Sequence, residues 1–142
     1  MARDPDCVFC SIVAGEIEAE VVLDDEEVLG FLDHRPLFPG HVLLVPRDHH
    51  ATLEDLPDEM LEPLFAAARR LATAVREAMG SQGTFVAMNN VVSQSVPHLH
   101  VHVVPRNKKD GLRGFFWPRN PYEGDEHMAE TAEAIRRALA NG

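Results

Sequence analysis

The sequence predicts an α+β fold, in which five antiparallel strands form one sheet and one main helix lies between the third and fourth strands. Three observations predict it. Strand-like segments recur along the chain with turn residues between them. One long segment has helical periodicity. The links between the first strands are short, which suits antiparallel neighbours.

The five expected strands are short runs rich in β-branched and other apolar residues. Turn residues separate the first three of them: Asp24-Asp25, then Arg35-Pro36 and Pro39-Gly40. The expected strands cover residues 20–23, 28–33, 41–45, 84–89 and 98–104.

The main helix is expected in the segment between the third and fourth strands. Apolar residues recur there at helical spacing from Leu61 to Met79, and Gly80 is placed to cap the C-terminus. Pro63 is expected near the first turn, where its missing N–H removes no helical hydrogen bond.

Two further helices complete the expected fold. A short helix should cover residues 7–14 and end at Gly15, and an amphipathic helix should cover residues 125–140. The segment 106–122, rich in Gly, Pro and Arg, is expected to be a long loop. With 142 residues the chain suits a single domain, 1–142, with a core at about 7–119 and a C-terminal helical tail.

Composition argues against several classes of protein. The formal net charge of -10 disfavours nucleic-acid and membrane-surface binding, because both use basic surfaces. The apolar runs are too short to cross a bilayer, and charged residues interrupt the N-terminus where a signal peptide would need an apolar segment, so we expect a cytoplasmic protein. A small phosphorylated ligand still fits, since basic residues cluster at Arg106, Lys108, Lys109, Arg113 and Arg119.

The stretch "VPHLHVHVVPR" places three histidines at alternate positions. In a strand, His98, His100 and His102 would share one face at intervals of roughly 6 to 7 Å, while the apolar residues between them would face the core. The simplest explanation is a solvent-exposed polar face. Two functional explanations compete with it: imidazoles as metal ligands, or one imidazole as a nucleophile with another as proton donor.

The longer stretch "QSVPHLHVHVVPR" resembles the signature of the histidine triad family. "CVFCSIVAGEI" is similar to the family's N-terminal segment, and "FLDHRPLFPGHVLLVPRDHH" to its ribose-side strand and following turn. The resemblance covers most of the chain from Cys7 to about Arg119.

The resemblance implies a nucleotide hydrolase or nucleotidyl transferase that acts through a covalent intermediate. His100 would attack the α-phosphate, and water would then release a nucleoside monophosphate. His102 and Ser95 would stabilise or protonate the leaving group, and Asn89 and Gln94 would donate hydrogen bonds to phosphate oxygens.

Other positions take roles from the same resemblance. His41 matches a further active-site histidine, and Asp33 matches the residue that binds the ribose hydroxyls. Phe9, Ile12 and Phe31 match apolar positions that enclose the purine base, although composition alone would place them in the core.

The pair "CVFC" allows a redox pair, an inert helical pair or half of a zinc site. No strand is expected before Cys7, which disfavours a thioredoxin-like pair. By resemblance to bacterial family members, Cys7 and Cys10 would bind structural zinc together with His49 and His98, with His50 as an alternative to His49.

One loop departs from the family pattern. Relatives carry a glycine-rich turn between the Asn pair and the Gln, whereas "NNVVSQS" is about two residues shorter and has no glycine. Val91 and Val92 do not easily adopt positive φ, so we expect a turn of a different construction.

The sequence also leads to expectations about the substrate and the oligomeric state. The basic cluster after the histidines favours a dinucleoside polyphosphate over a purine nucleoside phosphoramidate. The alternatives are a non-catalytic nucleotide-binding module and a zinc protein that acts through partners. The resemblance also implies a homodimer.

Overall fold

The computed structural model describes residues 3–112 and 119–141. The chain forms two compact units, Met1–Asp110 and Gly111–Gly142. The first unit carries the sheet and the second carries the C-terminal helix. That the whole chain is a single domain stays a prediction.

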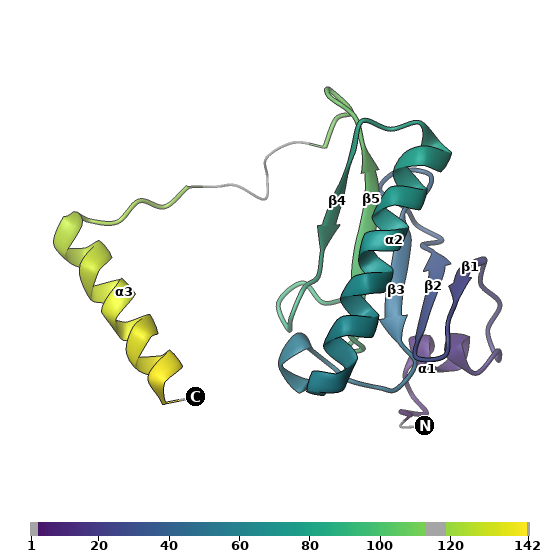
Figure 1. Ribbon diagram of the computed structural model, residues 1–142, viewed down its shortest axis with the longest axis horizontal. Coiled ribbons are helices and arrows are strands. Elements are labelled where there is room, and N and C mark those ends of the chain that lie inside the picture. Colours follow the sequence, from purple (N-terminus) through teal and green to yellow (C-terminus); the bar gives the residue numbers. More distant parts are fainter. Residues whose placement is uncertain (1–2, 113–118, 142) are drawn as a thin grey trace. The chain divides into compact units, whose positions relative to one another are not determined.

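The first unit contains the predicted five-stranded sheet, with every neighbouring pair antiparallel (Figure 1). The strand order is β1-β2-β3-β5-β4, so the fourth strand lies at the edge and the fifth pairs with the third. The strands are β1 Val21–Asp24, β2 Val28–Leu32, β3 Val42–Pro46, β4 Gly83–Ala87 and β5 Val101–Arg106.

Helix α2 (Leu61–Met79) covers one face of this sheet, which we call the apolar face (Figure 1). Short 3-10 turns at Leu53–Asp55 and Asp58–Met60 lead into it. Gly80 ends it in the left-handed conformation, with a φ of 61°, as predicted. The buried core on this face contains the residues Leu23, Val28, Val42, Leu44, Leu56, Leu64, Ala67, Ala68, Leu71, Val75, Leu99, Val101 and Val103.

Gly40 allows the end of α2 to approach the start of β3. Its φ is +98°, and a Cβ atom there would lie 2.6 Å from Cγ of Met79. Both facts favour glycine at this position, because a side chain would collide with the helix.

Helix α1 (Val8–Val13) packs on the opposite face, which we call the histidine face. It is one residue shorter at each end than predicted. A second buried cluster joins it to the strands and contains the residues Cys7, Phe9, Cys10, Leu29, Phe31, Leu43 and Val45.

Helix α3 (Asp125–Ala140) has the predicted bounds. Met128, Ile135 and Leu139 on its apolar side are exposed, and none of its residues is buried. Among the described residues, no helix is both long and apolar enough to cross a membrane.

Candidate functional site

The triad histidines lie on the histidine face, and two of them are deeply buried. His98 is 0% exposed and His100 is 3% exposed, whereas His102 is half-buried. The explanation of an exposed polar face is therefore wrong, because Phe9 of α1 packs against the rings of His98 and His100. The fifth strand begins only at Val101, so His98 and His100 precede it rather than opening it.

His100 has one ring nitrogen fixed and the other free. Its Nδ1 lies 2.7 Å from the backbone carbonyl oxygen of His98. A carbonyl can only accept, so the proton of neutral His100 sits on Nδ1. Its Nε2 therefore carries an unprotonated lone pair, the form that a nucleophile needs.

His41 and His102 form a directed pair beside it. The backbone N–H of Leu37 donates to Nδ1 of His41 at 3.1 Å, so the proton of His41 sits on Nε2. That Nε2–H donates to Nδ1 of His102 at 2.9 Å. The remaining N–H of His102, at Nε2, is thus available to a substrate.

Burial keeps these two imidazoles neutral. Burial, together with the neighbouring rings of His100 and His41, lowers the pKa of His102 to about 4. Burial also lowers the pKa of His41, although Asp33, with Oδ2 3.8 Å from Nε2 of His41, opposes the shift. Both rings are neutral at pH 7.

Asp33, His41 and His102 also have the side-chain types of a metal site, with ligand atoms within 4.8 Å of one another. The hydrogen bond from Leu37 argues against this use. Because the proton of His41 is on Nε2, that nitrogen has no lone pair to offer a metal. The arrangement fits a proton-donating pair better.

A second cluster has the geometry of a tetrahedral metal site. Cys7, Cys10, His49 and His98 place their ligand atoms within 4.8 Å of one another. Nδ1 of His98 lies 3.4 Å from Sγ of Cys7 and 3.5 Å from Sγ of Cys10, and Nδ1 of His49 lies 3.4 Å from Sγ of Cys10. Tetrahedral Zn–S and Zn–N bonds would separate sulfur and nitrogen by about 3.6 Å, so these residues fit zinc.

Backbone groups orient this cluster. Nε2 of His98 donates to the carbonyl of Pro46 at 2.8 Å, which leaves Nδ1 unprotonated and facing the sulfurs. Burial lowers the pKa of His98 to about 4 and raises the pKa of the Cys7 thiol. His50 is not part of the cluster, and its carbonyl accepts from the N–H of Leu99.

The loop between β4 and the triad corrects one expectation. Val91 does adopt a positive φ, of 69°, and so does Ser93, at 62°. The side chain of Gln94 holds this strained turn, since its Oε1 accepts from the N–H of Val91 at 3.0 Å and its Nε2 donates to the carbonyl of Ala51 at 2.6 Å. Such strain in a β-branched residue is costly, and it is often found at functional sites.

The other predicted binding residues vary in exposure. Nδ2 of Asn89 donates to the carbonyl of Ser93 at 3.2 Å, and Ser95 is exposed. Asp33 and Ile12 are half-buried. By contrast, the rings of Phe9 and Phe31 are buried and packed edge-on at 5.5 Å, as core residues are.

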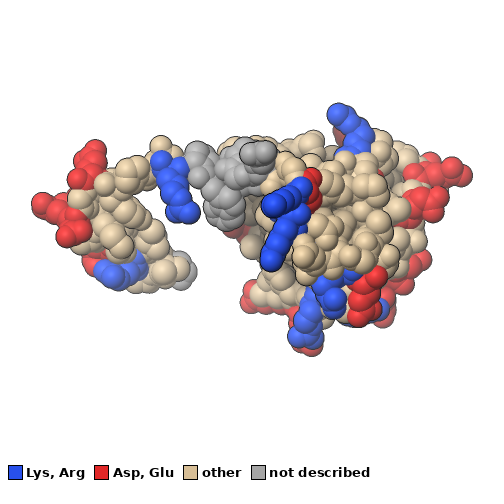
Figure 2. Space-filling model, turned by 90° about the horizontal axis from the view of Figure 1, so that it is seen from above, with Lys and Arg blue, Asp and Glu red and all other residues tan. Residues whose placement is uncertain are grey.

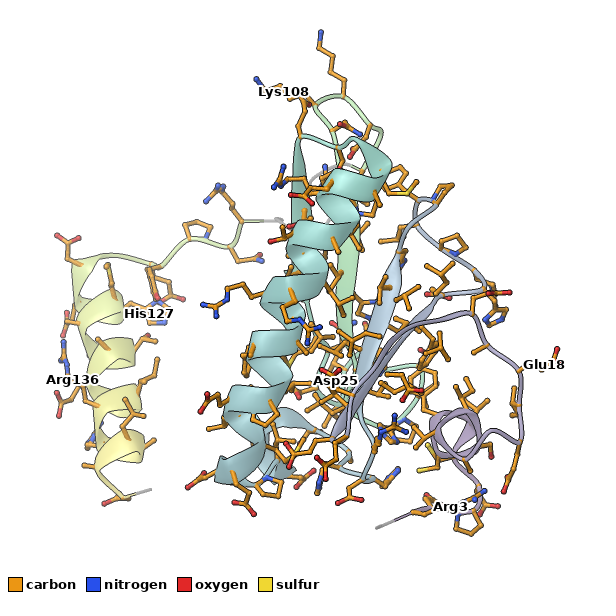
Figure 3. The ribbon with its side chains drawn as sticks, turned by 45° about the vertical axis from the view of Figure 1, so that its right-hand side comes forward. Arg3, Glu18, Asp25, Lys108, His127 and Arg136 are labelled. Carbon is orange, nitrogen blue, oxygen red and sulfur yellow. The ribbon has the colours of Figure 1, made fainter. Side chains whose placement is uncertain are left out.

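Of the basic residues after the triad, Arg106, Lys108 and Lys109 lie at or just beyond the other end of β5. Arg106 ends this strand and binds Asp110 at 2.6 Å and 3.1 Å. With about 3.3 Å per residue, its Cα is about 13 Å from that of His102. Lys108 projects from the end of the sheet distant from α1 (Figure 3). Arg113 lies outside the described residues.

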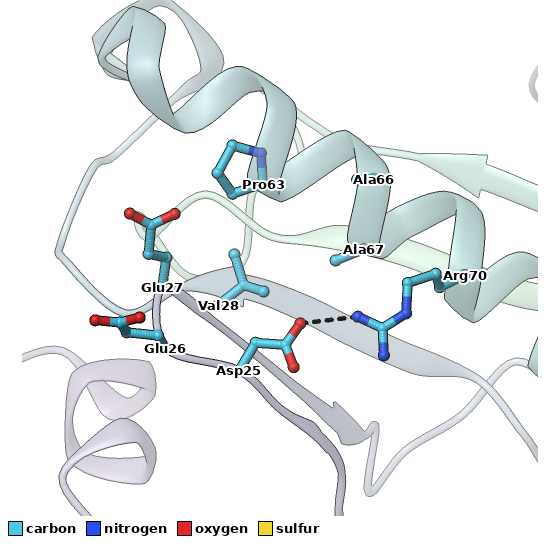
Figure 4. Close-up of a pocket in the computed structure, with 8 residues that line it drawn as sticks. All are labelled: Asp25, Glu26, Glu27, Val28, Pro63, Ala66, Ala67 and Arg70. Carbon is cyan, nitrogen blue, oxygen red and sulfur yellow. Dashed lines mark hydrogen bonds and ion pairs between the residues drawn. The ribbon is translucent and has the colours of Figure 1, made fainter.

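A pocket on the described surface is unsuited to a nucleotide. It has a volume of about 350 Å³ and lies between α2 and the β1–β2 turn, where Arg70 pairs with Asp25 at 2.9 Å (Figure 4). Glu26 and Glu27 also line it and would repel phosphate. On the face in Figure 2, acidic and basic side chains are interspersed over the described residues.

Three contributors to these sites were missed by sequence reasoning: the N–H of Leu37 and the carbonyls of Pro46 and His98. Each is a backbone group, which every residue type carries, so no side-chain pattern identifies it. Their partners His41, His98 and His100 were all predicted.

Comparison with known proteins shows which family this chain resembles. The HIT domain matches residues 14–109. The chain is 33% identical over 136 residues to Protein hit of Bacillus subtilis, covering 94% of this chain and 92% of that protein. It is 30% identical to the adenylylsulfatase HINT3 of Arabidopsis thaliana (96% and 71% covered) and 28% identical to the adenosine 5'-monophosphoramidase HNT1 of Candida albicans (99% and 95% covered).

Solved structures of similar proteins have the same fold. The crystal structure of SMU.412c from Streptococcus mutans matches with a TM-score of 0.87 and 33% identity, covering 97% of this chain and 88% of that chain. A Zn-bound histidine triad family protein from Mycobacterium smegmatis matches with a TM-score of 0.72 and 36% identity, covering 95% and 97%.

Proposed function

The chain belongs to the HIT family, and from that premise we propose that it is a nucleotide hydrolase with a covalent nucleotidyl-His100 intermediate. Its product would be a nucleoside monophosphate. The single observation that carries this proposal is the hydrogen bond from Nδ1 of His100 to the carbonyl of His98, because it leaves Nε2 as an unprotonated nucleophile.

The reaction would proceed in two displacements at phosphorus. In the first, Nε2 of His100 forms a bond to the α-phosphorus while the bond to the leaving group breaks and its electron pair goes to the leaving atom. The free N–H of His102 hydrogen-bonds that atom as its charge develops, and His41 holds His102 in the required tautomer. In the second, water attacks phosphorus and releases a proton to solvent, while the bond from phosphorus to Nε2 of His100 breaks and its electron pair returns to Nε2.

The remaining predicted residues would hold the nucleotide. Asp33 would accept from the ribose hydroxyls, and Ile12 would contact the base together with Phe9 and Phe31. Asn89, Gln94 and Ser95 would bind phosphate oxygens. Gln94 has one amide hydrogen left for this role, because its carbonyl oxygen and its other hydrogen already hold the loop.

We infer a substrate with a small leaving group, such as a nucleoside phosphoramidate or an adenylyl sulfate. The preference for a dinucleoside polyphosphate depends on a basic cluster whose nearest member, Arg106, has its Cα about 13 Å from that of His102 along β5 and is paired with Asp110. The names of two relatives, a monophosphoramidase and an adenylylsulfatase, support the smaller groups. A dinucleoside polyphosphate hydrolase is the second candidate.

Product analysis separates these candidates. The protein is incubated with adenosine 5′-phosphoramidate, adenylyl sulfate and a diadenosine polyphosphate side by side, and AMP is quantified. We expect AMP to form fastest from one of the first two. Faster release from the polyphosphate would reverse the inferred preference, and no release from any of them, with AMP still bound, would indicate a non-catalytic binding module.

We also propose that Cys7, Cys10, His49 and His98 bind one structural zinc ion per chain. When bound, zinc would tie α1 to the histidine face through four protein ligands, with no open position for substrate. Metal analysis of the purified protein should give about one zinc, and Cys10→Ala should lose it while its neighbour variant Ser11→Ala retains it. Metal-free protein with unchanged thermal stability would contradict this proposal.

A further inference from the structure

We propose that Phe9 is a positioning residue for the nucleophile, one that holds the imidazole of His100 in its reactive orientation and couples it to the cysteine pair. This proposal rests on the proposed function, in which His100 attacks phosphorus. Phe9 is thereby assigned a role beyond that of a wall against the purine base.

The ring of Phe9 meets the rings of the triad edge-on. Its centroid lies 5.0 Å from that of His100, with an interplanar angle of 85°, and 6.0 Å from that of His98, at 72°. On its other side it packs against Phe31. Edge-to-face geometry is attractive and directional, so this ring favours one orientation of its neighbour.

A single hydrogen bond holds the ring of His100, so packing decides how often that bond opens. The bond from Nδ1 to the carbonyl of His98 fixes the tautomer and, because Nδ1 lies off the Cβ–Cγ axis, also sets χ2. This torsion is soft in histidine, so the neighbouring rings oppose its rotation whenever the bond opens. Phe9 supplies that packing together with His102, whose ring centroid also lies 5.0 Å away, and Nε2 is thereby held toward the bound phosphate.

The position of Phe9 depends in turn on the cysteine pair. It lies between Cys7 and Cys10 in α1, a helix of six residues that is too short to be stable alone. Cys7 caps this helix, and its Sγ accepts from the N–H of Cys10 at 3.3 Å. Whatever holds the two sulfurs against His49 and His98 therefore also holds Phe9 against His100.

Burial agrees with this assignment. Phe9 is 7% exposed, so little of its surface is available to a substrate base. Ile12, one turn further along α1, is half-buried and better exposed for that contact. His98 completes the arrangement, because its ring faces the sulfurs while its carbonyl holds His100.

The test compares Phe9→Leu with Leu71→Val in protein as purified, with its metal. Leucine keeps an apolar side chain but removes the ring edge. Leu71→Val loosens the core on the apolar face and controls for a general loss of stability. Two quantities are measured: the ¹⁵N shifts and Nδ1–H exchange rate of His100 by NMR without substrate, and kcat and KM.

In Phe9→Leu we expect Nδ1–H exchange at least about tenfold faster and a kcat about tenfold lower, because misorientation affects the chemical step, whereas loss of a base contact alone would raise KM only. Leu71→Val should change neither. An unchanged NMR signature in Phe9→Leu, or a raised KM with unchanged kcat, would overturn the proposal and leave Phe9 as a base contact alone. The NMR readout needs no turnover, so it decides the role of Phe9 even if the proposed hydrolase activity fails.

Discussion

The apolar face and the histidine face are built from alternate residues of one segment, yet they are held together by different physics. Leu99, Val101 and Val103 are all fully buried against α2, where stabilisation depends on apolar area and volume. On the other side, His98, His100 and His102 depend on directed hydrogen bonds, each of which fixes one ring nitrogen and frees the other.

The comparison teaches where function and stability reside in this fold. The apolar face can be altered with a loss of stability and little effect on chemistry. The histidine face can lose its chemistry while the chain stays folded. Neighbouring positions in the sequence should therefore respond in opposite ways to substitution.

The largest effect is expected at His100. His100→Asn keeps a donor for the carbonyl of His98 but has no nucleophilic nitrogen, so kcat should fall by about 10⁴-fold or more, by analogy with the loss of other enzymic nucleophiles. AMP binding should persist. His127→Asn, at an exposed histidine of α3, serves as the matched control. Comparable kcat values for the two variants would remove the distinction between the faces.

Leu99→Ala tests the adjacent position. This side chain is fully buried beneath α2, so its truncation should lower the free energy of unfolding by about 2–5 kcal/mol. Urea denaturation measures this change. The kcat per folded molecule should stay within about twofold of the wild type, and a much larger loss would mean that the apolar face takes part in the chemistry.

Acid should destabilise the histidine face selectively. The pKa of His98 and of His102 falls from 6.5 to about 4 in the folded chain, so the unfolded chain binds more protons between these values. Stability should be complete above pH 6.5 and fall as the pH drops toward 4, by up to about 1.4 kcal/mol per pH unit for each group. Urea denaturation of metal-free protein at pH 7, 6 and 5 checks this, because His98 titrates only when it holds no metal, and a flat profile would contradict the depressed pKa values.

The smallest effect is expected at the strained loop. Val91→Gly relieves a positive φ, whereas Val92→Gly removes an equally exposed valine that has no such strain. Val91→Gly should therefore be the more stable variant by about 1 kcal/mol. If thermal unfolding gives the two variants equal stability, the turn carries no strain of this kind.

Much of the fold was predictable because the spacing of apolar and turn residues along the sequence indicates where strands and helices form. The turn pairs, the amphipathic segment ending at Gly80 and the alternation around His100 led to the five strands and to α2, within a few residues. The order of the strands was not predictable, because the position of β4 at the sheet edge depends on how α2 crosses the sheet. Composition also did not predict that α1 packs over His98 and His100, since a six-residue segment has little pattern of its own.

For the site, the sequence identified the side chains but not the hydrogen bonds that orient them. Cys7, Cys10, His49 and His98 were chosen by resemblance, and the geometry separated His49 from His50. The contacts that select tautomers come from backbone atoms and could not be read from residue types. Val91 was expected to avoid positive φ, and it adopts it because Gln94 and neighbouring groups hold the turn.

The most direct measurement is the mass of the intact chain during turnover. Reaction with a nucleoside phosphoramidate is quenched rapidly without acid, since phosphohistidine is acid-labile, and the polypeptide is weighed and fragmented. We expect a transient nucleotidyl adduct located on His100 and absent from His100→Asn. Steady consumption of substrate with no adduct, or with an adduct on another residue, would contradict the account.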